Sequence, residues 1–358
     1  MAYTTIDDPS AYFQTKIYTG TGSSNAITND GNSDLQPDWI WGKARTQTYN
    51  HNVFDTSRGL TKRLTADQLD AENTDSTTIT AVGSDGFTLG TSANLNGSSV
   101  NYVAWQWKAN GGTTTTNDAS ATGVGTIDSA YQINSTSKFS IVTYTGNGSG
   151  GASFAHGLGV APDLVILKNR DTGRSWFVGH HKIGFNFIAG HLNSNDDKDE
   201  DSVYWNNTAP SSTVVTLGTN EGGNESGDNF VAYCFTEVQG YSKFGSFTGN
   251  GNVDGPFIYT GFKPAFGIFK RTDTTGNWYM MTGKIGDDGQ DGNPLEDRLE
   301  ANTNATEADM GQGYDFLSNG VKVRHNGGEI NGSGNSFIYM IWAEHPFVSS
   351  KGVPVTAR

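Results

Sequence analysis

Apolar and polar residues alternate with a period of two along most of the chain, and this pattern predicts β-strands. In residues 102–107, a valine and two tryptophans share one face of the expected strand. The comparable runs at 230–235 and 337–342 are apolar on both faces, so we expect these strands to be central and covered on both sides. No long segment shows the apolar stripe of a helix.

Shorter strands are expected directly after three prolines, because proline cannot donate to a strand ladder and marks its start. Turn signals of the Asn-Gly and Asp-Gly type separate the strands at hairpin spacing. The pattern therefore predicts an all-β fold built from antiparallel β-sandwich units of a jelly-roll-like type. The short strands are expected at residues 38–41, 163–167 and 265–269.

Three segments of the chain share one order of motifs, which predicts a supersecondary unit used three times. Each opens on an aromatic-Thr-Gly triplet, continues to a proline six residues before a lysine, and closes on an apolar strand six residues after an asparagine. The lysines are Lys43, Lys168 and Lys270, and the asparagines are Asn96, Asn224 and Asn331. We expect the repeated lysines to serve the folding of their own units. The expected organisation is unit 1 at 1–110, a flexible linker at 111–137, unit 2 at 138–239 and unit 3 at 240–358.

The composition is typical of a folded, loop-rich chain, since aromatic residues make up 11 % and 47 glycines account for the modest hydrophobic content of 34 %. The formal net charge of -14 would repel phosphate backbones, so nucleic acid is not an expected partner. The N-terminus lacks the features of a signal peptide and no run approaches transmembrane length. We therefore expect synthesis in a cytoplasm and no membrane insertion.

The sequence contains no fingerprint of nucleophilic, phosphoryl or dinucleotide chemistry. Cys234 lies in an apolar strand and is expected to be a buried, inert thiol. His180, His181 and His191 are the best zinc-ligand candidates, but no matching set recurs in the other units, and surface histidines are favoured. We expect a non-enzymatic protein without a cofactor.

Two acidic loops resemble the alternating start of a calcium-binding loop. Asp30, Asn32 and Asp34 form the first, and Asp287 and Asp291 belong to the second. Neither loop is followed by the glutamate that completes an EF-hand. Structural calcium therefore remains an alternative to the absence of any metal.

Tryptophan beside amide side chains is a common arrangement for stacking a sugar ring and binding its hydroxyl groups. Trp205, Asn206 and Asn207 lie outside the repeated motifs and are the expected ligand-binding residues. Trp176 and Trp278 stand at one distance from the lysines of their units, so we interpret them as core residues.

Several strings resemble a domain family recurrent in virion-associated proteins of tailed bacteriophages, especially marine ones. They lie at residues 5–14, 37–45, 54–59, 85–90, 156–163 and 240–251. The resemblance implies a structural protein on the virion surface, as a capsid decoration, head fibre or tail fibre, made in the host cytoplasm. It implies other virion proteins as partners, a homo-oligomer with a trimer as the default by analogy, and contact with host surface glycan.

Two other functions remain open. A virion-associated polysaccharide depolymerase would need two carboxylates facing across a groove, and Asp171, Asp273, Glu296 and Glu300 are available, although the first two are also typical turn residues. A free lectin-like carbohydrate-binding protein is the second alternative. Unit 1 departs from the other units at His51, where they carry tryptophan, and we expect it to serve attachment to the particle.

Overall fold

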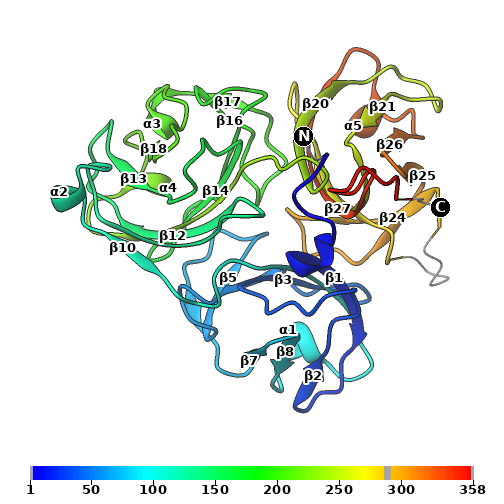
Figure 1. Ribbon diagram of the computed structural model, residues 1–358, viewed down its shortest axis with the longest axis horizontal. Helices are drawn as coiled ribbons and strands as arrows, with labels where there is room; N and C mark the ends of the chain where they lie inside the picture. The colour runs from blue at the N-terminus through cyan, green and yellow to red at the C-terminus, as the bar shows by residue number, and fades with distance from the viewer. Residues whose placement is uncertain (1–2, 286–291, 356–358) are drawn as a thin grey trace.

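The computed structural model describes residues 3–285 and 292–355. The structure is all-β with antiparallel sheets, as the alternating pattern predicts, and the helices are single turns. Three lobes surround a common centre (Figure 1). Unit 1 ends at residue 110, unit 2 covers 111–239, and unit 3 begins at residue 240.

Unit 1 has a main sheet in the order β1-β9-β3-β4-β5-β6, covered by a small sheet in the order β2-β8-β7. Its elements are η1 (Pro9–Ala11), β1 (Phe13–Thr19), β2 (Asn25–Ile27), β3 (Trp39–Ala44), β4 (Asn52–Asp55), β5 (Lys62–Thr65), β6 (Asn73–Thr74), β7 (Ile79–Gly83), β8 (Gly86–Leu89), α1 (Ala93–Asn96) and β9 (Asn101–Trp107).

Unit 2 has a main sheet in the order β10-β11-β12-β19-β14-β15 and two short pairs, β13-β18 and β16-β17. Its elements are β10 (Thr115–Asn117), α2 (Ala119–Thr122), β11 (Ser129–Asn134), β12 (Phe139–Thr145), β13 (Ser153–Ala155), β14 (Leu164–Asn169), β15 (Phe177–His180), β16 (Phe187–Ile188), β17 (Asp199–Glu200), α3 (Ser202–Trp205), β18 (Val214–Thr216), α4 (Glu221–Asn224) and β19 (Asn229–Phe235).

Unit 3 has a sheet in the order β20-β27-β22-β23-β24-β25-β26-β21, whose last three strands lie over the outer face of the first ones. Its elements are β20 (Ser242–Thr248), β21 (Phe257–Tyr259), β22 (Phe262–Arg271), β23 (Trp278–Thr282), β24 (Leu295–Glu300), β25 (Ala308–Leu317), β26 (Gly320–Val323), α5 (Gly328–Asn331) and β27 (Ser336–Pro346).

The three main sheets share the order of their central strands. In each unit an early strand pairs with the closing strand, as β1 with β9, β12 with β19 and β20 with β27. The closing strand pairs on its other side with the strand that follows the repeated proline or contains it, namely β3, β14 or β22. The closing strand is therefore central in every unit.

The inner faces of the three sheets meet in one hydrophobic cluster at the centre of the molecule. Aromatic rings connect each pair of units there, because flat rings from different sheets interlock at short centroid distances. Trp39 stacks on Tyr233 at 4.4 Å between units 1 and 2, and Trp105 stacks on Phe266 at 4.9 Å between units 1 and 3. Phe235 meets Trp342 edge to face at 5.5 Å between units 2 and 3. The units thus do not have separate inner cores.

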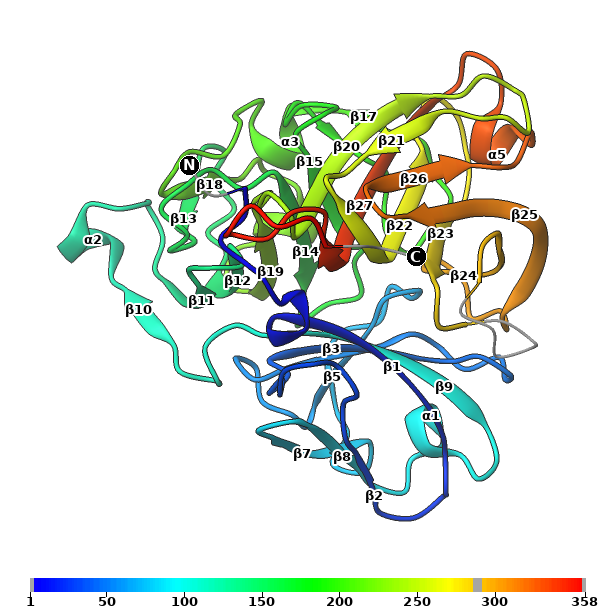
Figure 2. The same cartoon turned by 45° about the vertical axis from the view of Figure 1, so that its right-hand side comes forward.

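The outer face of each main sheet packs against the smaller second layer of the same unit. In unit 3, for example, Phe269 of β22 stacks on Tyr314 of β25 with centroids 4.3 Å apart. Two apolar faces are required because the inner face meets the other units while the outer face meets its own second layer. Figure 2 shows the second layer of unit 1, with β2, β7 and β8 below its main sheet.

The three repeated lysines join neighbouring units, and each is almost fully buried. Every ammonium donates to a backbone carbonyl of another unit, in the cyclic order 1 to 3, 2 to 1 and 3 to 2. Burial lowers the pKa of these lysines, to about 8 for Lys43 and Lys270 and about 7 for Lys168. The bonds run from Lys43 to Asn304 (3.3 Å), from Lys168 to Leu69 (2.9 Å) and from Lys270 to Asn195 (3.4 Å).

One sequence position is tryptophan in units 2 and 3 and histidine in unit 1. A second cyclic set of hydrogen bonds explains why an aromatic ring with an N–H group is found there in every unit. A ring N–H at this position donates to a carbonyl of the same neighbouring unit that the lysine reaches. Trp41 also donates to the other ring nitrogen of His51 at 2.9 Å, which orients the imidazole. The bonds run from His51 to Glu300 (3.0 Å), from Trp176 to Thr65 (2.8 Å) and from Trp278 to His191 (3.0 Å).

The repeated asparagines and glycines shape one turn in each unit. The side-chain oxygens of Asn96, Asn224 and Asn331 accept a backbone N–H at 2.9–3.0 Å from the residue after the aromatic-Thr-Gly triplet. The triplet ends in glycine because any Cβ there would lie 2.3 Å from a carbonyl oxygen of the facing turn. These two requirements fix the spacing seen in the sequence.

The segment at 111–137, expected to be a flexible linker, is largely part of unit 2. β10 and β11 lie in it, and β11 pairs with β12 over six residues. Gln132 of β11 also donates to Thr56 at 2.8 Å and to Ser57 at 2.7 Å, both in unit 1. The linker prediction is therefore wrong for these residues, because the threonine-rich composition that resembled a linker also suits strands.

Within the described residues, no helix has the length and apolar character needed to cross a membrane.

Candidate functional site

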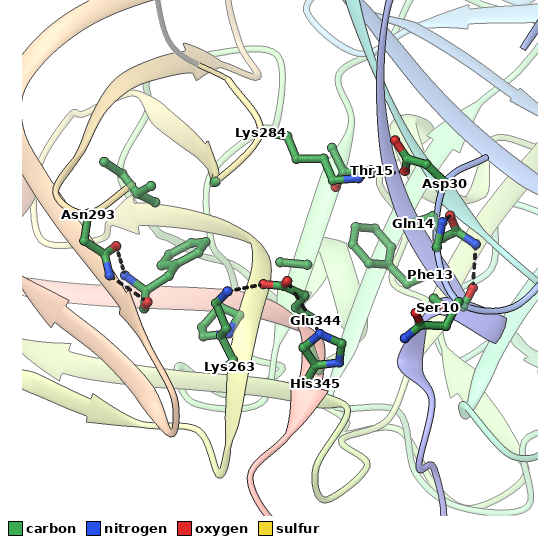
Figure 3. Close-up of a pocket in the computed structure, with 18 of the residues that line it drawn as sticks. Ser10, Phe13, Gln14, Thr15, Asp30, Lys263, Lys284, Asn293, Glu344 and His345 are labelled. Carbon is green, nitrogen blue, oxygen red and sulfur yellow. Dashed lines mark hydrogen bonds and ion pairs between the residues drawn. The ribbon is translucent and has the colours of Figure 1, made fainter. Parts of the chain in front are cut away.

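A cleft of about 530 Å³ lies between units 1 and 3 (Figure 3). One wall comes from η1, β1 and the loop after β2, and the other comes from the start of β22, the end of β27 and the segments around β24. Phe13, in the floor, belongs to the shared core and stacks on Phe266 at 6.0 Å and Trp342 at 6.1 Å. The floor is thus the edge of the core that joins the units.

The cleft opens where unit 3 departs from the other two. Asp38 and Asp163 follow the repeated prolines of units 1 and 2, and each accepts a backbone N–H just beyond its closing strand, at 2.7 and 2.8 Å. Unit 3 has Ala265 at this position, which cannot accept that bond. The pairing of β22 with β27 instead continues outward with register shifts, carrying Lys263 and Glu344 to the cleft.

Lysines neutralise the carboxylates among the described residues that line the cleft. Lys284 of unit 3 lies 2.8 Å from Asp30 of unit 1, and Lys16 approaches the other oxygen of Asp30 at 3.2 Å. Burial opposes ionisation of Asp30, but the two lysines together hold its pKa below the ordinary value. Lys263 pairs with Glu344 at 2.8 Å. A lowered pKa does not suit Asp30 to general-acid catalysis, which needs a raised one.

Two amide side chains of the cleft are occupied in holding its walls. Gln14 donates to Ser10 and Ser33 at 3.0 and 2.8 Å and accepts from the backbone N–H of Gly31 at 2.8 Å. Asn293 exchanges two hydrogen bonds with the backbone of Phe316, at 2.9 and 2.7 Å. Both walls are therefore tied by local bonds.

The hydroxyl of Thr15 is different, because it has no hydrogen-bond partner among residues 3–285 and 292–355. Thr15 is only 4 % exposed and lies two residues after Phe13 on β1, so both side chains point from the same face of the strand. It lines the cleft as well. The hydroxyl oxygen itself is buried, so it lies beneath the surface of the unit 1 wall.

The predicted ligand-binding tryptophan is not in the cleft and not on the surface. Trp205 is fully buried, at the end of α3, and meets Phe185 edge to face at 5.7 Å in the outer core of unit 2. The prediction of a surface contact is wrong, because α3 turns this ring onto the main sheet. Asn206 and Asn207 are exposed with positive φ values of 51°, and they end the helix. Trp176 and Trp278 are buried, as expected.

The first calcium candidate does not have the arrangement of a calcium loop. Both oxygens of Asp30 face lysines, while Asn32 and Asp34 are exposed. Asp287 and Asp291 lie outside the described residues. In the part of the chain that the structure describes, no three His, Cys, Asp or Glu side chains are grouped as metal ligands.

Three of the other residues considered from the sequence have structural partners, and His180, which was expected at the surface, is fully buried. Asp171 accepts from the backbone and the side chain of Asn229, both at 2.8 Å, and Asp273 pairs with Arg271 at 2.7 Å. His181 lies 3.1 Å from Asp163. They lie in other parts of the fold than the cleft.

Sequence reasoning missed the cleft residues Thr15, Lys263 and Glu344. The available signal was Ala265, since it interrupts a Pro-Asp motif that the other two units keep. This difference changes where the closing strand pair ends.

The fold and the cleft define an all-β protein of three sheets around a shared aromatic centre, with a ligand-sized opening between its first and third units. The chain belongs to the family described as Domain of unknown function (DUF7483), which matches residues 8–346. No curated protein and no solved structure matches it.

Proposed function

We propose that the protein is a non-enzymatic structural component of a tailed-phage virion, exposed on the particle as a capsid decoration, head fibre or tail fibre. The sequence resemblance to virion-associated domains motivates this proposal. The observation that best supports it is the shared core, which joins three units into one body through aromatic contacts and cyclic lysine bonds.

A body of this kind suits a scaffold. Its apolar inner faces hold the units together, while loops such as 21–24 and 250–254 are exposed and can differ without disturbing the core. The ion-paired carboxylates of the cleft favour a binding role over the depolymerase alternative. Partners are then other virion proteins, and host surface glycan is a further contact.

The test is to purify particles of a phage that carries the gene and to search for the protein by mass spectrometry and immunogold labelling. The proposal predicts that the protein is present at fixed copy number on the head or the tail. Its absence from purified particles would contradict the proposal. Incubation of the isolated protein with host capsule should release no reducing ends, whereas release would favour the depolymerase.

Attachment through unit 1 stays a prediction, but the structure changes how it should be tested. Deleting residues 1–110 would remove Trp39 and Trp105 from the shared core and unfold the remainder. Cross-linking on intact particles avoids this problem. The hypothesis predicts cross-links from Lys62 and Lys108 of unit 1 to other virion proteins, and cross-links confined to unit 2 or 3 would contradict it. Light scattering of the isolated protein measures the expected trimer.

A further inference from the structure

β21 is the last strand of the unit 3 sheet, and it carries two exposed aromatic rings. Phe257 is 46 % exposed and Tyr259 is 55 % exposed, and no other aromatic residue is exposed in the part of the chain that the structure describes. Residues two apart on a strand share a face. The two rings therefore point the same way, while Ile258 between them points into the unit 3 core.

The backbone of β21 has hydrogen-bonding groups that face outward. The carbonyl of Pro256 and the N–H of Thr260 bond to β26 and the turn before it, both at 3.0 Å. Bonded residues alternate along an antiparallel strand, so Ile258 also bonds to β26. Phe257 and Tyr259 then direct their N–H and C=O groups to the other side. Within the described residues no strand pairs with that side, and such an edge is a template for a further strand.

The outward groups are symmetric about Ile258, which makes the edge complementary to itself. A second copy of β21 can lie antiparallel to the first, with a two-fold axis at Ile258. Phe257 of each chain is then opposite Tyr259 of the other, and each pair exchanges two hydrogen bonds. The two rings of a pair lie on one face of the joined sheet, where cross-strand aromatic pairs are stabilising.

The free edge is too short to give a longer foreign strand any additional bonds. The N–H of Gly255 donates to Val323, and the carbonyl of Gly261 accepts from Phe347, both at 3.1 Å. Only the groups of Phe257 and Tyr259 are left between these two residues. A second copy satisfies all of them, so it is the occupant that the edge matches.

Local charge does not oppose the contact. β21 has no charged residue, and Lys322, which lies opposite Phe257 on β26, pairs with Asp254 at 2.6 Å. The formal net charge of -14 makes two copies repel each other over longer distances. Salt at about 0.15 M screens that repulsion beyond about 8 Å.

We propose that β21 is an interface between two copies of this chain, formed by antiparallel pairing of the two strands about a two-fold axis at Ile258. The inference goes beyond the proposed function, because it concerns the isolated chain and predicts a dimer where the resemblance to phage proteins suggests a trimer. The contact is small, so its dissociation constant should be about 10–100 μM.

Sedimentation velocity of the full-length protein from about 1 to 300 μM should show the mass rising from one chain to two. Phe257→Lys combined with Tyr259→Lys places like charges opposite each other and should weaken association at least about tenfold. The matched control combines Leu69→Lys with Val160→Lys. These are exposed apolar residues of units 1 and 2, so the charge change is the same and the dimer should remain.

Cysteine cross-linking tests the register. Phe257→Cys and Tyr259→Cys, mixed as two single variants and oxidised, should form a disulfide between chains, because opposite residues of a bonded pair have Cα atoms about 5.5 Å apart. Either variant alone should not, since identical residues are then diagonal neighbours about 7–8 Å apart. The native Cys234 is buried and should not interfere.

Thermal unfolding of each variant controls for the fold, and the melting temperature should hold because the replaced side chains are about half exposed. A single chain at every concentration, a trimer, or a lysine variant that associates like the original protein would overturn the proposal. Cross-linking of one cysteine variant as fast as the mixture would overturn it as well. If the lysine variant does not fold, the cysteine mixture decides.

Discussion

Replacing Arg58 with methionine should lower the free energy of unfolding by about 3–5 kcal/mol, because it leaves the buried carboxylate of Asp55 without its cation. The side chains of Arg58 and Asp55 are both 0 % exposed, and their closest atoms are 2.5 Å apart. Arg58 also pairs with Glu72 at 2.9 Å and approaches the hydroxyl of Tyr233 in unit 2 at 3.4 Å. The network thus joins two units as well as stabilising one turn.

The magnitude follows from what remains after the substitution. Asp55 keeps the hydroxyl of Tyr233 at 2.7 Å, and Glu72 keeps Arg170 at 2.8 Å, so neither carboxylate loses every partner. We therefore expect the lower half of the range. Burial opposes ionisation of Glu72, but Arg170 and Arg58 together lower its pKa. The stability they provide is present above the unfolded pKa of 4.5, so the difference between the two proteins should shrink as pH falls below that value.

The assay is urea unfolding followed by tryptophan fluorescence, which reports on the whole core because all eight tryptophans are buried. Arg63→Met is the matched control, since Arg63 pairs with Asp75 at 3.3 Å nearer the surface and should lose at most about 1 kcal/mol. A loss for Arg58→Met below about 1 kcal/mol, or equal to that of the control, would show that the buried Arg58 network does not stabilise the fold.

Two further predictions concern the repeated residues. Burial lowers the pKa of Lys168 from 10.5 to about 7. Between these values the unfolded chain binds more protons than the folded one, so stability should rise with pH from 7 to 10. Lys168→Met should reduce the slope of this rise by up to about 1.4 kcal/mol per pH unit. Urea midpoints measured across that range for both proteins check it, and parallel curves would contradict it. Gly146→Ala should lower stability by about 1–3 kcal/mol because its Cβ would lie 2.3 Å from the carbonyl oxygen of Glu225. Gly283→Ala, whose added Cβ would meet no atom of the described residues within 4 Å, should stay within about 0.5 kcal/mol.

The sequence predicted the fold class because alternation of polar and apolar residues is a local signal. It also predicted that the closing strands would be covered on both sides, and they are. Local alternation could not predict which residues cover the inner face of each main sheet. The contact of Trp105 with Phe266 joins residues far apart in the chain, and no local pattern specifies which sheets face each other.

The repeated lysines show the same limit. Their spacing was visible, and we expected Lys43, Lys168 and Lys270 to serve the folding of their own units. Each instead reaches a carbonyl of a neighbouring unit. A spacing shows that a position matters but not what the side chain contacts.

The candidate site was the least predictable part. Trp205 was chosen for its residue type and polar neighbours, but the burial of a ring depends on the element that covers it, here a one-turn helix over a sheet. Thr15 and Ala265 have ordinary side chains. Thr15 stands out because its hydroxyl has no hydrogen-bond partner among the described residues, and Ala265 because the other two units carry an aspartate at this position. Only the assembled fold shows these features.

The central claim is that the three units share one core and behave as one body, and scanning calorimetry tests it most directly. A protein with one shared core should show a single transition whose van't Hoff enthalpy equals the calorimetric enthalpy, about 250 kcal/mol near 60 °C for a chain of this length. Two or three separate transitions, or a van't Hoff enthalpy near one third of the calorimetric value, would show units that unfold independently and would contradict the claim.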